Sequence, residues 1–391
     1  MITTSILVLF LVSILGSGIL FLGWNITPSR MKLLLSFSAS YLLSLTFLHL
    51  MPEAMADGGE GSLDFFYSLG WREISVLTAG ADCQERTSFF MQSPDGSTIA
   101  IELAEIAGKK HAPAALSGWD ASSLGLGIAL QAAATYNPKE ILICLGGSAS
   151  SDGGLGIFEG LGISVLNRNS IEVTHGLGGV ARAQSVNTEE LSQIRDIFSS
   201  INVKILVDTK AQLTGNPNAI SMYGKQKGLT AIQRNRATSY IKNWAQLLQQ
   251  INPSFQPVAP GTGAAGGCSA ALQAIFNASI VSGADYFAEL SGITNHIDSE
   301  SIVITGEGKV DDSTLTGKAI MPVINAAITN KAQLIVVAGV IEASAKSRIQ
   351  AMSPQAMFFD ISSFAPNKAY SLDHASEILT DNFAKELELL Q

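Results

Sequence analysis

The chain has 391 residues, more than one average domain needs and enough for two or three. Its formal net charge is -9 and the sequence contains no basic stripe, which argues against nucleic-acid binding. The three cysteines, Cys83, Cys144 and Cys268, are far apart and odd in number, so they predict neither a metal site nor a disulfide framework.

The first 54 residues are predicted to form a two-helix transmembrane hairpin. Residues 5–24 and 33–51 carry no Asp, Glu, Lys or Arg, and each stretch is long enough to cross a bilayer as a helix. A signal peptide fits less well, because a basic n-region is lacking and a second apolar stretch follows at once. A buried helical hairpin in a soluble protein is the alternative.

The loop between the two stretches holds Arg30 and Lys32, the basic residues nearest to the spans. The positive-inside rule then places this loop in the cytoplasm and everything after residue 52 outside it. Residues 38–54 resemble the first helices of the ZIP family of divalent-metal transporters, although the later helices that carry that family's ligands have no counterpart here. We therefore assign no transport site to His49 or Glu53.

From residue 55 onward the chain alternates between strand and helix patterns. Short apolar runs predict strands at 74–77, 98–103, 140–145, 203–207, 301–305 and 334–340, and helical spacing predicts helices at 124–136, 155–161, 230–250, 264–282 and 317–330. This alternation predicts a parallel α/β architecture. Ligands of such sheets bind at the carboxyl ends of the strands, where Asp208 and Glu307 are expected.

Three glycine-rich loops, at residues 146–154, 260–267 and 306–318, are the strongest candidates for chemistry. Glycine lets backbone N–H groups approach a phosphate, carboxylates can hold Mg²⁺, and lysines can neutralise a phosphoryl group. The third loop combines all of these, with Glu307, Lys309, Asp311, Asp312 and Lys318. The alternative for the other two loops is a tight turn that permits close packing.

Neither of two common nucleotide-binding motifs is present. No loop has the P-loop spacing G-x-x-x-x-G-K-[ST]. Residues 261–266 match the letters G-x-G-x-x-G, but they follow a proline-containing loop where a dinucleotide fold requires a strand. A Walker-type NTPase and an NAD-binding protein are therefore both disfavoured.

Taken together, the motifs of residues 55–391 resemble the glycerate kinases of the GarK type. Six segments match in chain order, at residues 55–61 (ADGGEG), 146–162 (GGSATNDGGxG and ALG), 208–215 (DVxNPLxG), 223–228 (FGPQKG), 260–267 (PGxGAAGG) and 305–318 (TGEGxxDxQTxxGK). The resemblance implies ATP-dependent phosphorylation of D-glycerate with Mg²⁺. It also implies a Rossmann-like domain, formed by residues 55–105 and 290–391, and an inserted α/β domain at residues 106–289.

The same resemblance implies the site residues. Asp57, Asp208, Lys227 and Lys318 are the candidates for catalysis, and Asp152 and Glu307 are the candidates for the metal. The nucleotide is expected at Gly147, Ser148, Gly153, Gly261, Gly263, Gly266, Gly267, Gly306 and Gly308. Which carboxylate acts as the base stays open, and a helix cap or loop brace is the alternative for each carboxylate.

The sequence departs from the family pattern at its start, where the family's first strand and its APDSFKGS-type loop are replaced by the predicted hairpin. We hypothesise a chimera of a transporter fragment and a truncated kinase, anchored in the membrane and impaired in activity. The family implies a cytoplasmic kinase body, whereas the charge rule places the body outside. A non-catalytic membrane-anchored protein and a kinase for another small hydroxy acid are the alternatives, and the product, 2- or 3-phosphoglycerate, stays open.

Overall fold

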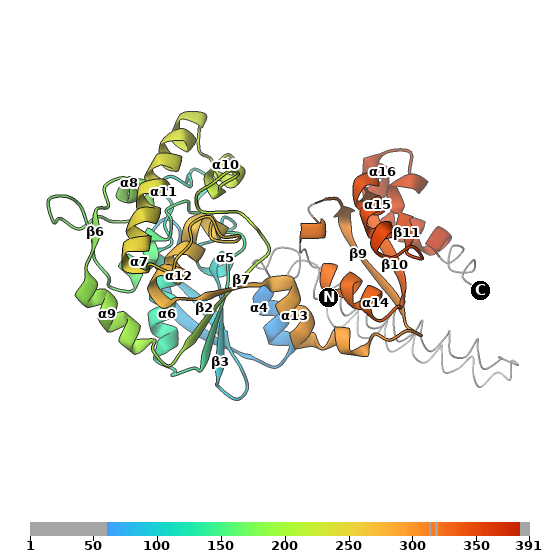
Figure 1. Ribbon diagram of the computed structural model, residues 1–391, viewed down its shortest axis with the longest axis horizontal. Helices are drawn as coiled ribbons and strands as arrows, with labels where there is room; N and C mark the ends of the chain where they lie inside the picture. The colour runs from blue at the N-terminus through green and yellow to red at the C-terminus, as the bar shows by residue number, and fades with distance from the viewer. Residues whose placement is uncertain (1–60, 313, 317–319, 384–391) are drawn as a thin grey trace, which may run out of the picture. The chain divides into compact units, whose positions relative to one another are not determined.

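The computed structural model describes residues 61–383 except 313 and 317–319, and Figure 1 shows the arrangement of its elements. The predicted hairpin at residues 1–54 lies outside these described residues, as do Asp57 and Lys318. Within the described ranges, no helix is both long enough and apolar enough to cross a bilayer.

A six-stranded sheet organises the part of the chain before residue 283. Its order is β1-β2-β3-β4-β7-β8. The strands are β1 (Arg72–Ala79), β2 (Glu85–Gln92), β3 (Thr98–Glu102), β4 (Glu140–Cys144), β7 (Asn202–Val207) and β8 (Ser279–Ser282). The first three strands pair antiparallel, and β3, β4, β7 and β8 run parallel. Three carboxyl ends, at Glu102, Cys144 and Val207, therefore lie next to one another.

Helices cover both faces of this sheet. Ile141 and Ile143 belong to the main core cluster, while Leu142 between them points to the other face and is equally buried. On that second face α4 (Ser62–Ser68) contacts β3, and α13 (Gly283–Ser291) contacts β7. These two helices lie side by side in Figure 1, and the rings of Phe65 and Phe287 meet edge to face at 5.0 Å. Burial on both faces explains the continuous apolar runs of the parallel strands.

The remaining helices of this part pack around the main core. They are α5 (Leu103–Ala107), α6 (Leu124–Ala134), α7 (Leu155–Gly160), α8 (Gly176–Val180), α9 (Thr188–Ile197), α10 (Ala219–Tyr223), α11 (Ala231–Ile251) and α12 (Cys268–Phe276). A short antiparallel ribbon joins β5 (Val165–Leu166) to β6 (Ser185–Val186). The long helix α11 begins at a capping box, in which Thr230 and Gln233 satisfy each other's backbone N–H groups.

A second, three-stranded parallel sheet has the order β11-β10-β9. Its strands are β9 (Ile302–Val310), β10 (Gln333–Ile341) and β11 (Met357–Asp360), and the helices that follow its strands or end the described chain are α14 (Met321–Thr329), α15 (Ala343–Met352), α16 (Lys368–Asp373) and α17 (Ala375–Ile378). Among the described residues β9 pairs with β10 alone. Ile302 and Ile304 on this strand are 43% and 41% exposed.

All six predicted strands form, and the differences have physical causes. The helix predicted at 264–282 ends at Asn277, which adopts a left-handed conformation (φ 53°), and the chain continues into β8. The strand β2 was not predicted, because its exposed, charged start masks the apolar end. It makes the first sheet mixed where a parallel one was expected. Residues 306–309, predicted as a loop, continue strand β9, because they pair with β10 up to Val310.

The strand pairing bears on the predicted domain boundary at residue 105, which stays a prediction. We expected residues 55–105 to share a domain with residues 290–391. The strands of residues 72–102 instead belong to the six-stranded sheet, since every residue of β3 pairs with one of β4. Backbone hydrogen bonds thus link this segment to the part predicted as the inserted domain.

Candidate active site

The glycine-rich loops at 146–154 and 260–267 pack directly against each other. The Gly153 N–H donates to the Gly266 carbonyl at 2.9 Å, and a Cβ placed on Gly266 would lie 2.3 Å from the Ser150 carbonyl oxygen. A Cβ on Gly153 would lie 2.6 Å from the indole of Trp244. Glycine is required here by close packing of protein on protein. This is the alternative explanation for the predicted nucleotide contacts at Gly153, Gly266 and Gly267.

The other predicted nucleotide glycines lie in three places. Gly261 and Gly263 lie at the turn before α12, and the Gly263 N–H already donates to the Ala211 carbonyl at 2.9 Å. Gly147 has a positive φ of 62° and leads into Ser148. In strand β9, a Cβ on Gly306 would meet the Val337 carbonyl of β10, whereas Gly308 faces open space. Gly308 therefore leaves more room for a ligand than Gly306.

Asp152 acts as a brace within the first loop. Its side chain is fully buried, and its carboxylate accepts four hydrogen bonds. Oδ2 accepts from the Ser123 N–H at 2.9 Å, the Ser123 hydroxyl at 2.8 Å and the Gly156 N–H at 3.2 Å, and Oδ1 accepts from the Gly154 N–H at 3.2 Å. These bonds tie the start of α6 to the start of α7. Such bracing is the alternative that the sequence left open for this carboxylate, and the metal role of Asp152 stays a prediction.

Lys227 meets the first loop from a turn far along the chain. Its Nζ donates to the Ser148 hydroxyl at 2.7 Å and to the Ser150 carbonyl at 2.6 Å. The residue as a whole is partly exposed, and the partial removal of its ammonium group from water lowers its pKa to about 8. The nearby Lys109 lowers the pKa further, while Cys268 and Asp152 oppose the shift. The structure thus brings together two predicted site residues, Ser148 and Lys227.

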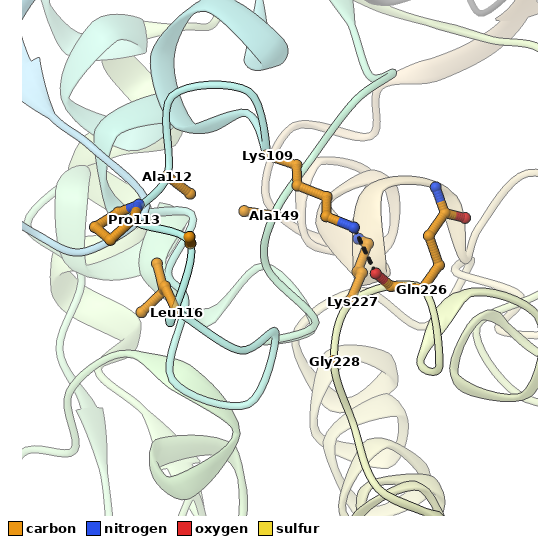
Figure 2. Close-up of a pocket in the computed structure, with 9 residues that line it drawn as sticks. Lys109, Ala112, Pro113, Leu116, Ala149, Gln226, Lys227 and Gly228 are labelled. Atoms are coloured by element: carbon orange, nitrogen blue, oxygen red, sulfur yellow. Dashed lines mark hydrogen bonds between the residues drawn. The ribbon is translucent and has the colours of Figure 1, made fainter.

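A cavity of about 190 Å³ opens beside this lysine, and Figure 2 shows its lining. Lys109 lies across from the turn and donates from Nζ to the Gln226 carbonyl at 2.7 Å. The apolar part of the lining comes from Ala112, Pro113, Ala114, Leu116 and Ala149. Sequence reasoning missed Lys109, and its one signal was a lysine pair shortly after a predicted strand.

The carboxyl edge of the parallel strands carries two acidic side chains. Asp208 directly follows β7, as predicted, and Glu102 ends β3. Glu102 is 4% exposed and accepts the N–H groups of Gly61 and Leu63, each at 3.1 Å. Burial raises its pKa to about 7 against the effect of those two hydrogen bonds. Between the two carboxylates, burial and the charges of Glu102 and Asp208 raise the pKa of the Cys144 thiol.

A separate set of charges lies at the carboxyl end of β9. Glu307 accepts a short hydrogen bond from the Thr314 hydroxyl, whose oxygen also accepts from the Asp311 N–H at 3.0 Å. Lys309 pairs with Glu342 at 2.6 Å and with Asp311 at 3.3 Å, and hydrogen bonds to these carboxylates raise its pKa. Lys309 is therefore engaged with carboxylates, whereas Lys109 and Lys227 are not.

The family model of the glycerate kinase family matches residues 43–390. The chain belongs to the glycerate kinase family. The match begins inside the second stretch predicted to span the membrane, before the kinase-like region expected from residue 55. The resemblance found in the six sequence motifs is thereby confirmed for the kinase part, and the structure does not test the ZIP-like hairpin.

Relatives of known sequence and structure agree with this assignment. A glycerate kinase of Bacillus cereus is 30% identical over 267 residues, which cover 68% of this chain and 69% of that protein. A glycerate 2-kinase of Escherichia coli is 28% identical over 323 residues, or 80% and 84% of the two chains. A solved structure described as a putative glycerate kinase 2 from Salmonella typhimurium superimposes with a TM-score of 0.63 at 26% identity, covering 78% of this chain and 85% of that one.

Kinases commonly use Mg²⁺, so the described residues can be searched for its ligands. No group of three His, Cys, Asp or Glu side chains arranged for a metal occurs in the described part of the chain. Mg²⁺ in kinases is commonly held by one or two carboxylates together with substrate phosphates, so such a group is not required. Glu307, in the carboxyl-terminal half of strand β9, and Asp152 therefore both stay predicted metal residues.

Proposed function

We propose that this chain is a glycerate kinase that transfers the γ-phosphoryl group of ATP to D-glycerate with the help of Mg²⁺. The observation that carries the proposal is the family match over residues 43–390. The acceptor is inferred from relatives that are named as glycerate kinases. Their names refer to those proteins, and the transfer to this chain is our inference.

Phosphoryl transfer requires the substrates to be positioned and the phosphate charge to be neutralised, and different residues are proposed for each role. We propose that Glu307 holds Mg²⁺, which neutralises phosphate charge when bound. Asp57 and Asp208 are the proposed candidates for the base that accepts the proton of the acceptor hydroxyl. Lys227 and Lys318 are proposed to bind anionic groups of the substrates, and Gly308, with nothing within 4 Å of an added Cβ, leaves space for a phosphate.

The ATP requirement also bears on location. ATP is a cytoplasmic substrate, and we therefore propose a cytoplasmic kinase body. This is opposite to the orientation that Arg30 and Lys32 predict for a membrane hairpin. Protease protection of the kinase body in intact cells of the source organism distinguishes the two, since digestion from outside would contradict the cytoplasmic location.

The activity is tested with the purified full-length protein, ATP, MgCl₂ and D-glycerate. We expect ADP release that requires D-glycerate, and a phosphoglycerate whose 2- or 3-position is read by ³¹P nuclear magnetic resonance. L-Lactate and glycolate in place of D-glycerate test the alternative of another small hydroxy acid. A folded protein that releases no ADP with any acceptor would support the non-catalytic alternative.

A matched pair of variants links turnover to the site. Lys227→Met removes the ammonium group that contacts Ser148, and we expect a drop in kcat/KM of at least about 100-fold, as for the loss of a buried charged contact. Lys225→Met removes an exposed lysine from the same turn and serves as the control. Equal activities of the two variants would show that Lys227 does not belong to the active site.

A further inference from the structure

The cavity between Lys109 and Lys227 concentrates positive charge. Two ammonium groups line it, and no carboxylate does. Lys109 bonds to the carbonyl of Gln226, the residue directly before Lys227, and its charge disfavours the charged form of Lys227. Two like charges beside one cavity repel each other, and an anion placed between them removes that repulsion.

Both lysines retain hydrogen-bonding capacity. An ammonium group has three N–H donors. Lys227 uses two of them, on the Ser148 hydroxyl and the Ser150 carbonyl, and Lys109 uses one, on the Gln226 carbonyl. Neither lysine forms an ion pair with any residue that the structure describes. The remaining donors are available to an oxygen-bearing anion in the cavity.

The backbone holds these lysines in place. Lys109 is fixed by a hydrogen bond from its N–H to the Gly147 carbonyl at 2.9 Å, and Lys227 by a bond from the Gly118 N–H to its own carbonyl at 2.6 Å. The loop before α6, the first glycine-rich loop and the turn before α11 therefore form one frame. An anion site with a rigid frame loses less entropy on binding than one on mobile side chains.

The size of the cavity limits the ligand. Its volume of about 190 Å³ lies below the roughly 300–1,000 Å³ of pockets that enclose drug-sized molecules. Its wall opposite the lysines is formed by small apolar side chains, among them Ala112 and Ala149. Such a space suits an anion on a short carbon chain and is too small for an adenine nucleotide.

We propose that the Lys109–Lys227 cavity binds the carboxylate of the acceptor acid, and that Lys109 is the residue that selects acceptors with a carboxylate. The proposal rests on the proposed kinase function for the identity of the acid, and the short carbon chain of a hydroxy acid fits the apolar wall. A nucleotide phosphate shares the same anionic chemistry, so the test separates the two sources.

The test compares Lys109→Gln with Lys225→Gln in the full-length protein. Lys109→Gln removes the charge but leaves the backbone bond to Gly147. We expect the KM for D-glycerate to rise by roughly tenfold or more, the usual consequence of losing one charge-assisted hydrogen bond, with the KM for ATP within about twofold of wild type. The exposed Lys225 lies outside the cavity lining, and its variant is expected to keep both constants.

Calorimetric titration with D-glycerate and with glycerol, without nucleotide, gives a second measurement that does not depend on turnover. Glycerol has the same carbon chain without the carboxylate, and we expect binding of D-glycerate alone, weakened in Lys109→Gln. A higher KM for ATP with an unchanged KM for D-glycerate would overturn the proposal in favour of a phosphate. Unchanged constants for both substrates would overturn it entirely. Lys109-dependent binding of D-glycerate without turnover would retain the site and reject the kinase function.

Discussion

The Lys227 ammonium donates to the Ser148 hydroxyl at 2.7 Å and so joins two segments 79 residues apart in the sequence. This contact places the turn before α11 against the loop after β4. Ser148 lies in the glycine-rich loop that follows β4, and Lys227 lines the cavity. Their bond therefore connects the loop at the end of the first sheet to the cavity wall.

The lowered pKa of Lys227 makes the free energy of unfolding change with pH in the alkaline range. Burial lowers its pKa from 10.5 to about 8, so between these values the unfolded chain binds more protons than the folded one. The free energy of unfolding therefore gains up to about 3 kcal/mol from this group as the pH rises from 8 to 10.5. We expect urea titrations at pH 8 and pH 10 to show a smaller gain in Lys227→Met than in wild type. The Lys225→Met control should keep the wild-type gain, and a Lys227→Met protein that also keeps it would contradict the assigned pKa.

Asp152 is expected to matter for folding and not for metal binding. Asp152→Asn replaces one of two accepting oxygens with an amide donor that faces backbone N–H groups. We expect a loss of about 2–4 kcal/mol in the free energy of unfolding, as for other broken buried charge networks.

The proposed dependence of the activity on Mg²⁺ provides the discriminating measurement for Asp152. We expect Asp152→Asn to leave the Mg²⁺ concentration for half-maximal rate unchanged at a temperature where the variant is folded. Glu307→Gln is expected to raise that concentration severalfold. A shift in Asp152→Asn and none in Glu307→Gln would assign the metal to Asp152 and exclude Glu307.

A substitution at Gly153 can distinguish a packing role of this glycine from a nucleotide contact. Its φ of 64° and the 2.6 Å approach of a Cβ to the Trp244 indole both oppose a side chain. We expect Gly153→Ala to lower the free energy of unfolding by about 2–4 kcal/mol through backbone strain and a forced shift of Trp244. Gly178→Ala is the control, because Gly178 lies in α8 with nothing within 4 Å of its added Cβ. A Gly153→Ala protein of wild-type stability with a raised KM for ATP would instead indicate a nucleotide contact.

The sequence predicted those features that depend on neighbours along the chain. Buried parallel strands appear as short apolar runs, so β4, β7 and β10 were found within one or two residues, and Asp208 was placed correctly after β7. The bond of Lys227 to Ser148 and the approach of Lys109 to the same turn were not predictable, because both depend on how three distant loops fold back on one another. Glycines at 153 and 266 were ambiguous for a physical reason, since close approach to a phosphate and close approach to another loop both require the absence of a Cβ.

The buried carboxylate of Glu102 was also not predictable from the sequence. Its effect on stability can be tested by measuring unfolding at different pH values. Its pKa is raised from 4.5 to about 7 mainly by burial, so the folded state binds more protons than the unfolded chain between these values. The contribution of Glu102 to stability is therefore fully present below pH 4.5 and decreases by up to about 3 kcal/mol as the pH rises through 7. Glu102→Gln has no proton to lose, and we expect its free energy of unfolding to lack this decrease between pH 5 and pH 8.

The Gln side chain retains one acceptor for the N–H groups of Gly61 and Leu63 but turns a donor toward the other. We therefore expect Glu102→Gln to be less stable than wild type at pH 5, with the difference shrinking toward pH 8 as the wild type acquires a buried charge. Urea unfolding at both pH values measures this, with the exposed Glu73→Gln as the charge-matched control. If the stability difference between Glu102→Gln and wild type were the same at both pH values, Glu102 would not titrate in this range.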